Sequence, residues 1–188
     1  MAIYTKISRN DIISIEQKFN LGKIISFKGI KKGIENTNYL IRTKNNKYIL
    51  TIFEKRVQKK DLPFFMSLMD KLNNHKINCP KPQKSKKGNY LVSIKNKPAS
   101  IVSFVEGKDK LKLNPKNCYE IGRNIAKLHM ASKKIKLYRK NSMSLSSWPK
   151  LLNKIGNKSN KIDINLNNLM ETSLRDIKKR WPRKLSSG

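Results

Sequence analysis

The strongest constraint on the fold is a change of sequence pattern near Gly107. Before it, short runs rich in β-branched and aromatic residues alternate with turn residues, which is typical of antiparallel strands joined by hairpins. After it, apolar residues recur every three or four positions, which indicates helices. The chain is therefore predicted to be an α+β protein, with a sheet-rich lobe over residues 1–104 and an all-helical part over residues 105–188.

Five strands are predicted in the sheet-rich lobe, at 24–30, 36–43, 47–53, 89–94 and 99–105. About five strands make an ordinary antiparallel sheet. A helix should precede them, because Ser8 and Asp11 have the spacing of a capping box. A second helix is predicted after Asp61, which can cap it, with Pro63 in its first turn. Its apolar residues share one side, so that side should pack on the sheet.

The second part should contain three helices. The best-defined one follows the capping residue Asn114, and its stripe of apolar residues includes His129. We expect this histidine to be a packed, hydrogen-bonded core residue. Further helices are predicted within SLSSWPKLLNKI and over 163–181, where Trp148 and Trp181 should be packing residues. Two lobes joined by one short connection leave a cleft, where small ligands commonly bind.

The chain is strongly basic, because 43 Lys and Arg against 12 Asp and Glu give a formal charge of +31. Such a charge attracts polyanions, so an RNA- or membrane-surface-binding module is one interpretation. The lysines are spread along the whole chain, however, and no RNA-binding motif accompanies them. We favour a solvated basic surface with no specific nucleic-acid partner and no membrane partner. Without a long apolar run or a secretory signal, the protein is predicted to be cytoplasmic, with Cys79 and Cys118 reduced.

The segment FKGIKKGIENTNYLI, residues 27–41, is a candidate for covering nucleotide phosphates. Small residues let backbone amides approach a phosphate, and Lys31 and Lys32 would add positive charge. The glycines lack the G-x-G-x-x-G spacing of a dinucleotide fingerprint, and the chain has no Walker sequence. Taken alone, the segment favours the simpler interpretation that Gly33 makes a hairpin turn.

Six blocks in a fixed order make the interpretation more specific. They are FKGIKKGIENTNYLIRT, KYILTIFEKRV, DLPFFMSLMDKL, INCPKP, ASIVSFVEG and IGRNIAKLHMAS. In this order and at these separations they closely resemble the first half of a homoserine kinase of the aminoglycoside-phosphotransferase type, a relative of protein kinases. The tail WPRKLSSG is similar to the stretch just before that family's catalytic segment. The resemblance implies a protein-kinase-like fold: a five-stranded antiparallel lobe, then an all-helical lobe truncated before the catalytic loop.

The resemblance also implies that the sheet lobe holds ATP. The hairpin from Gly29 to Asn38 would cover the phosphates, and the third strand would face the triphosphate. Residues 103–105 would form a linker between the lobes whose backbone hydrogen-bonds the adenine edge. The residues that the resemblance assigns to the nucleotide are Gly29, Lys31, Gly33, Asn38, Thr51, Lys55, Ser103, Phe104 and Val105. An aromatic and aliphatic sheet surface suits a planar base, which agrees with the composition of the strands.

The sequence departs from the wider fold in two respects. Thr51 occupies the position aligned with a third-strand lysine that usually grips the phosphates. Lys55 or Arg56 would supply this charge, or both are solvated residues at a strand end. Phosphoryl transfer in this fold also needs an aspartate in an H-x-D-x-x-x-x-N loop and a second aspartate for magnesium. Neither His75 nor His129 opens such a loop, so we expect no catalytic residue and no Mg²⁺ ligand in this chain.

These observations predict that the intact protein is a homoserine kinase, which transfers a phosphoryl group from ATP to the hydroxyl of L-homoserine in threonine biosynthesis. This chain alone should bind nucleotide weakly and lack catalysis. Two alternatives remain open. One is a related kinase whose acceptor is choline, a sugar or an aminoglycoside, and the other is the basic RNA- or polyanion-binding module.

Overall fold

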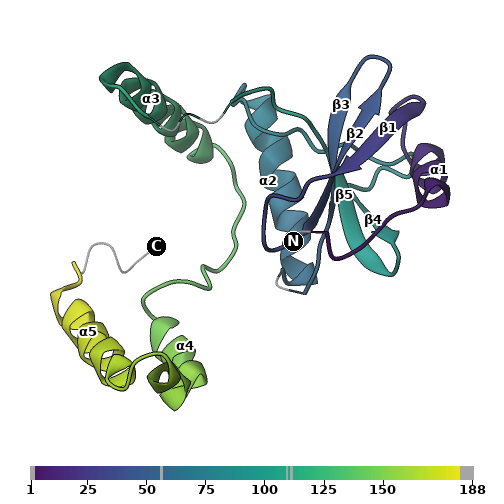
Figure 1. The fold of residues 1–188 in the computed structure, drawn as a ribbon. Helices are drawn as coiled ribbons and strands as arrows, with labels where there is room; N and C mark the ends of the chain where they lie inside the picture. Colours follow the sequence, from purple (N-terminus) through teal and green to yellow (C-terminus); the bar gives the residue numbers. More distant parts are fainter. Residues whose placement is uncertain (1–2, 56, 109, 111, 183–188) are drawn as a thin grey trace. The chain divides into compact units, whose positions relative to one another are not determined.

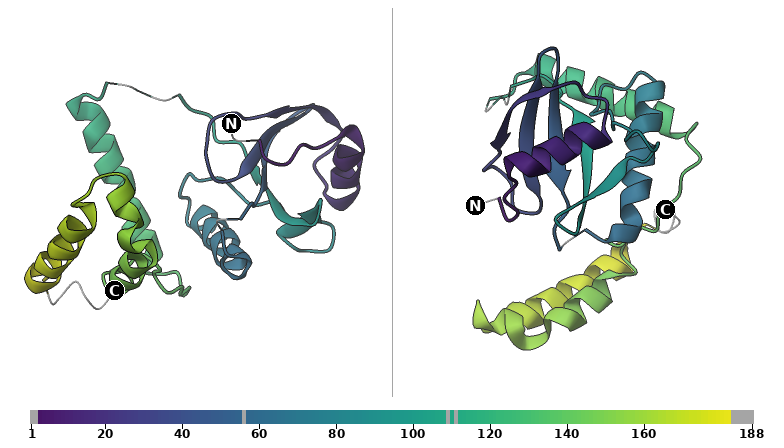
Figure 2. Two further views of the ribbon diagram at one scale, coloured as in Figure 1. Left: turned by 60° about the horizontal axis from the view of Figure 1, so that its bottom comes forward. Right: turned by 90° about the vertical axis from the view of Figure 1, so that its right-hand side faces the viewer.

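The computed structural model describes residues 3–55, 57–108, 110 and 112–182. The chain divides into two compact units, Met1–Tyr138 and Arg139–Gly188, which are described separately below. The first unit holds a β-sheet with helices around it, and the second is helical (Figures 1 and 2). The lobe boundary predicted at 104/105 falls inside the first unit and stays a prediction.

The first unit is built on a five-stranded antiparallel sheet, as predicted. Its strands are β1 (Ile24–Gly29), β2 (Thr37–Thr43), β3 (Lys47–Ile52), β4 (Leu91–Ile94) and β5 (Lys97–Ser103), in the order β1-β2-β3-β5-β4. Lys95 and Asn96 form the whole turn between β4 and β5, and both have the positive φ of a type I′ hairpin. Because this turn is shorter than predicted, Pro98 lies inside β5, where its carbonyl accepts a hydrogen bond from the Phe53 amide.

Helix α1 (Arg9–Lys18) covers one face of the sheet (Figure 1). It begins with the predicted capping box between Ser8 and Asp11. Strand side chains alternate between the two faces of a sheet, so every second residue faces this helix. The resulting core contains Ile12, Ile15 and Phe19 together with Tyr39, Ile41, Tyr48, Leu50, Ile52, Ala99 and Ile101. This core holds α1 and the four longer strands together.

Helix α2 (Leu62–Asn74) lies on the other side of the sheet from α1 (Figure 1). Pro63 is in its first turn as predicted, whereas Asp61 precedes the helix without making a side-chain capping hydrogen bond. Buried Leu62 and Met66 pack with Phe53, and the cluster extends to Leu91 on β4. The helix therefore covers the β4 edge of its face, as its apolar spacing predicted.

Helix α3 (Pro115–Ser132) starts at Asn114, whose side chain caps it as predicted. Most of its apolar stripe is not covered by the described residues of the first unit: Ala131 is buried, but Tyr119 is 69% exposed. His129 is exposed as well, so the prediction that it is a core residue is wrong. The periodicity identified the helix correctly, but periodicity does not say what covers the apolar side.

The second unit consists of α4 (Trp148–Ile155), the 3₁₀ helix η2 (Gly156–Lys161) and α5 (Leu166–Arg180). Both predicted helices are therefore present. Trp148 and Trp181 pack edge to face, with ring centroids 6.1 Å apart, and the Trp148 indole donates a hydrogen bond to the Met143 carbonyl. Among the described helices of both units, none is long and apolar enough to cross a membrane.

A polar network ties the amino-terminal segment to the sheet. The Thr5 hydroxyl donates to Glu54 Oε1 at 2.7 Å, and the Thr37 hydroxyl donates to the same oxygen at 2.8 Å. The Lys97 ammonium binds the other carboxylate oxygen of Glu54 and also donates to Thr5 Oγ1. Burial raises the pKa of Glu54, but the hydrogen bonds from Lys97, Thr5 and Thr37 outweigh burial, so its pKa is below the ordinary value.

Replacing Leu50, which is fully buried in the α1 core, should strongly destabilise the first unit. We expect Leu50→Ala to lower the free energy of unfolding by about 2–5 kcal/mol, because it removes buried apolar surface and leaves a cavity. Ile25→Ala is the matched control, since Ile25 is 65% exposed. It should change the free energy of unfolding by less than about 0.5 kcal/mol. Urea unfolding followed by circular dichroism measures both variants. An equal loss of unfolding free energy in Leu50→Ala and Ile25→Ala would contradict the position of the core.

The Glu54 network makes stability depend on pH in acid. A carboxylate whose pKa is lower in the folded state contributes stability above its unfolded pKa, near 4.5, and this contribution disappears as the pH falls through the folded value. Glu54→Gln should therefore be clearly less stable than the unmodified chain at pH 7, and the difference should shrink below about pH 4.5. Glu106→Gln is the control, since it breaks an exposed ion pair with Lys47. A Glu54→Gln defect that is constant from pH 7 to pH 3 would contradict this role.

Candidate nucleotide-binding face

The sheet face that points away from α1 is only partly covered. Its half-buried side chains are those that alternate with the core residues along β2, β3 and β5. We call the surface formed by Asn38, Leu40, Ile49, Thr51 and Val102 the open face. The strand register places these residues in two adjacent rows across the sheet.

The first row is polar. Asn38 is paired with Thr51, and the Thr51 hydroxyl donates to Asn38 Oδ1 at 2.8 Å, which confirms that both side chains lie on the same face. Because its oxygen is held by Thr51, the Asn38 amide turns its two N–H donors away from that contact. Both residues were predicted to bind nucleotide, and the structure brings them together.

The second row is apolar. Ile49 lies between Leu40 on β2 and Val102 on β5, and all three side chains are half-buried. A flat aliphatic surface of this kind suits one side of a planar ring. None of these three residues was predicted to bind nucleotide. Counting back by two from Thr51 gives Ile49, and counting forward by two from Asn38 gives Leu40, because side chains along a strand alternate with a period of two.

The β1–β2 hairpin lies at the same end of the sheet as the polar row. Gly29 ends β1, and the Ile30 amide donates to the Asn38 carbonyl at 2.8 Å, which closes the base of the connection over residues 30–36. Gly33 has φ +123°, a conformation that side chains disfavour, so a glycine is needed there. Lys31 is exposed in this connection. Three residues predicted for the phosphates are thus on one hairpin.

The third strand has no lysine at the position of Thr51. Lys55 is exposed just after β3, and Arg56 lies outside the described residues. Lys28 is a further exposed cation, paired across the sheet with Leu40 of the open face. Lys55 and Lys28 are thus exposed cations beside the open face, Lys55 beyond the end of β3 and Lys28 next to Leu40.

The linker after β5 lies at the opposite end of the sheet from the hairpin. The Ser103 amide donates to the Lys81 carbonyl at 2.9 Å, and the Phe104 amide donates to the Lys47 carbonyl at 3.0 Å. Lys47 also lies over the Phe104 ring. Two of the three linker amides predicted for adenine are thus already used within the lobe. Val105 is exposed, and among the described residues its amide has no backbone acceptor.

The hairpin and the linker are separated by the length of β3. Its six residues, Lys47–Ile52, span about 17 Å at about 3.3 Å per residue. This separation is comparable with the length of an extended nucleoside triphosphate. Among the described residues, no group of three His, Cys, Asp or Glu side chains could hold a metal ion.

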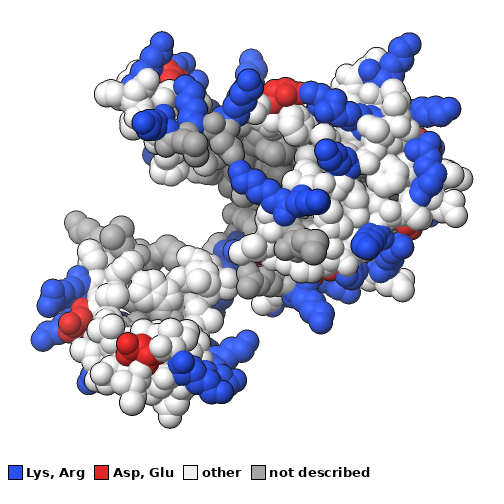
Figure 3. All heavy atoms as spheres, viewed as in Figure 1, with Lys and Arg blue, Asp and Glu red and all other residues white. Residues whose placement is uncertain are grey.

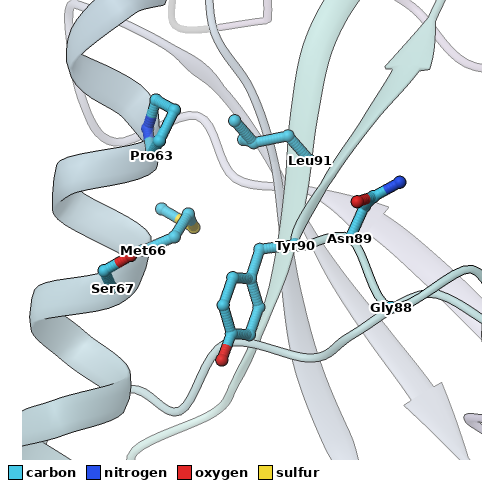
Figure 4. Close-up of a pocket in the computed structure, with 7 residues that line it drawn as sticks. All are labelled: Pro63, Met66, Ser67, Gly88, Asn89, Tyr90 and Leu91. Carbon is cyan, nitrogen blue, oxygen red and sulfur yellow. The ribbon is translucent and has the colours of Figure 1, made fainter.

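A separate pocket of 280 Å³ lies between α2 and the start of β4 (Figure 4). Met66 and Ser67 line it from the helix, and Tyr90 and Leu91 line it from the strand side. The pKa of Tyr90 is raised by burial and by its hydrogen bond to Asp70. None of the predicted nucleotide residues borders this pocket, so it is not part of the open face.

Comparison with known proteins identifies the family. Residues 26–184 match the family described as the phosphotransferase enzyme family. The chain belongs to this family. Its fold is similar to that of a spectinomycin phosphotransferase solved with ADP and spectinomycin, with a TM-score of 0.66 at 14% identity over 95% of this chain and 60% of that one. The predicted kinase-like fold is therefore confirmed.

Two curated relatives of this phosphotransferase are named homoserine kinases. The protein from Nitrobacter winogradskyi is 36% identical and the one from Rhizobium etli is 37% identical, each over all 188 residues of this chain. The chain spans 58% and 59% of their lengths, respectively. An AMP-bound spectinomycin phosphotransferase is also similar in fold, with a TM-score of 0.55 at 12% identity over 94% of this chain and 60% of that chain.

Proposed function

We propose that this chain is the ATP-binding part of a homoserine kinase. The observation that carries the proposal is the 36–37% identity to homoserine kinases over all 188 residues. The open face supports it, because an apolar row suited to a purine lies between a glycine-containing hairpin and the exposed linker residue Val105. The full reaction is transfer of the terminal phosphoryl group of ATP to the side-chain hydroxyl of L-homoserine.

Each part of the open face has a role in this proposal. Adenine rests on Leu40, Ile49 and Val102, and its polar edge meets the backbone of the linker at Val105. The phosphates extend along β3 toward Asn38 and the 30–36 hairpin, whose backbone amides face them. Ser103 and Phe104 contribute through their carbonyls and their shape, since their amides are already used.

The chemistry of transfer depends on groups that this sequence does not contain. Phosphoryl transfer relies on positioning and on charge stabilisation by Mg²⁺ and an acceptor-orienting aspartate. No H-x-D-x-x-x-x-N loop is present in the 188 residues. We assign these groups to the additional length of the relatives, and we place the enzyme in the cytoplasm, where ATP and amino acids are available.

The face shown in Figure 3 gives no support to a nucleic-acid function. Lys and Arg side chains are scattered over this face and do not form one continuous patch on it. A solvated surface explains this distribution, because scattered charges keep a protein soluble without forming a continuous track for a phosphate backbone.

Phosphate transfer tests the proposed reaction. A protein in which this chain continues to the length of its relatives should phosphorylate L-homoserine in preference to choline, a hexose or spectinomycin. The matched control is the 188-residue chain, which should bind ATP without transferring its phosphate. Preference for another acceptor would contradict the substrate. Transfer by the control would contradict the assignment of the catalytic groups to the remaining length.

A further inference from the structure

The amino-terminal segment, residues 3–7, lies behind the β1–β2 hairpin and contacts it at several points. The Tyr4 hydroxyl donates to the Ile34 carbonyl at 3.0 Å, near the tip of the connection. The Tyr4 and Thr5 amides donate to Thr37 Oγ1 at 2.9 and 3.1 Å, at its base. The segment therefore touches both the tip and the base of the hairpin.

At Gly29, residues 3–7 also contact the β1 arm of the hairpin. A Cβ atom at position 29 would overlap with the Ile3 side chain. Gly29 is paired with Tyr39, whose hydroxyl donates to the Thr5 carbonyl at 3.0 Å and accepts from the Ile7 amide. The glycine thus allows a close approach of the segment, in addition to any role toward a nucleotide.

The hydroxyl of Thr37 is the centre of these contacts. It is completely buried, accepts two backbone hydrogen bonds and donates one to Glu54. Glu54 is held in turn by Lys97, and its own amide donates to Asn36 Oδ1 at 3.3 Å. Breaking the hydrogen bonds of this buried hydroxyl would leave its three partners unsatisfied, which costs free energy. The contact between the amino-terminal segment and Thr37 is therefore difficult to break.

These contacts lie on the side of the sheet opposite to the open face. Thr37 is paired with Ile52 of the α1 core, whereas the next residue, Asn38, belongs to the open face. A ligand on the open face would therefore not touch Thr5, Thr37 or Glu54. These residues are able to act on such a ligand only through the hairpin.

We infer that residues 3–7 are a strap that fixes the 30–36 hairpin from behind in the position required by nucleotide phosphates, with Thr5, Thr37 and Glu54 as positioning residues. The inference rests on the proposed nucleotide function of the open face. A connection that is already ordered loses less conformational freedom when it binds a ligand, so the strap strengthens binding without contacting the ligand. Because the hairpin meets the phosphates, the strap should affect ATP and not adenosine.

Thr37→Val and Thr5→Val test the inference in the 188-residue chain. Each removes a hydroxyl and keeps the shape of the side chain. Either variant should weaken ATP binding about tenfold, which corresponds to about 1.4 kcal/mol, within the range of one intramolecular hydrogen bond. Adenosine binding should change less than twofold. Isothermal titration calorimetry with ATP and with adenosine measures both affinities.

Two controls separate positioning from general damage. Thr43→Val removes a hydroxyl that bonds Asn46 in the β2–β3 turn, and it should leave both affinities unchanged. Thr37→Ser keeps the hydroxyl and should restore ATP binding. If a valine variant unfolds, Tyr4→Phe carries the test, because the Tyr4 side chain is largely exposed and only its contact with Ile34 is lost. Tyr4→Phe should weaken ATP binding about threefold, because the lost contact contributes only part of the free energy of one hydrogen bond.

The outcomes distinguish the strap from the nucleotide proposal. If the unmodified chain binds neither ATP nor adenosine, the proposed nucleotide function is wrong, and the inference about the strap is wrong as well. If the unmodified chain binds ATP but the folded variants bind it equally well, the strap alone is wrong. Equal weakening of ATP and adenosine would also overturn it, because that pattern indicates general loss of structure.

Discussion

The alternation of side chains along β3 is the constraint on which the rest of the first unit depends. Leu50 and Ile52 point into the α1 core and are completely buried, while Ile49 and Thr51, which alternate with them, point to the open face. A shift of register by one residue would exchange the two faces and bury Thr51 in place of Leu50. The same buried core that stabilises the sheet therefore fixes which residues are presented to a ligand.

The partly buried network around Glu54 extends this order beyond the sheet. It joins the amino-terminal segment, the start of β2, the end of β3 and the start of β5 through one carboxylate. Moving a charge partly out of water costs free energy unless the charge is paired and hydrogen-bonded, and here Lys97 and two threonines supply those partners. The end of the sheet that carries the hairpin is thereby held by polar contacts, whereas its centre is held by apolar packing.

Much of this fold was predictable from the sequence, for local reasons. The capping boxes at Ser8 and Asn114 act over three residues, and the strands follow from runs of β-branched residues between turns. The burial of His129 was mispredicted because helical periodicity marks an apolar side but not its partner. The network of Thr5 with Thr37 and Glu54 could not be predicted either, since it joins residues up to 49 positions apart that no local pattern relates.

Hydrogen exchange of the 188-residue chain with and without ATP tests the central claim, that nucleotide binds along the open face, most directly. The account predicts that ATP slows exchange of the Val105 amide and of amides within residues 31–36, while the Ile30, Ser103 and Phe104 amides are already protected without it. Protection confined to residues 88–91, beside the pocket between α2 and β4, would contradict it.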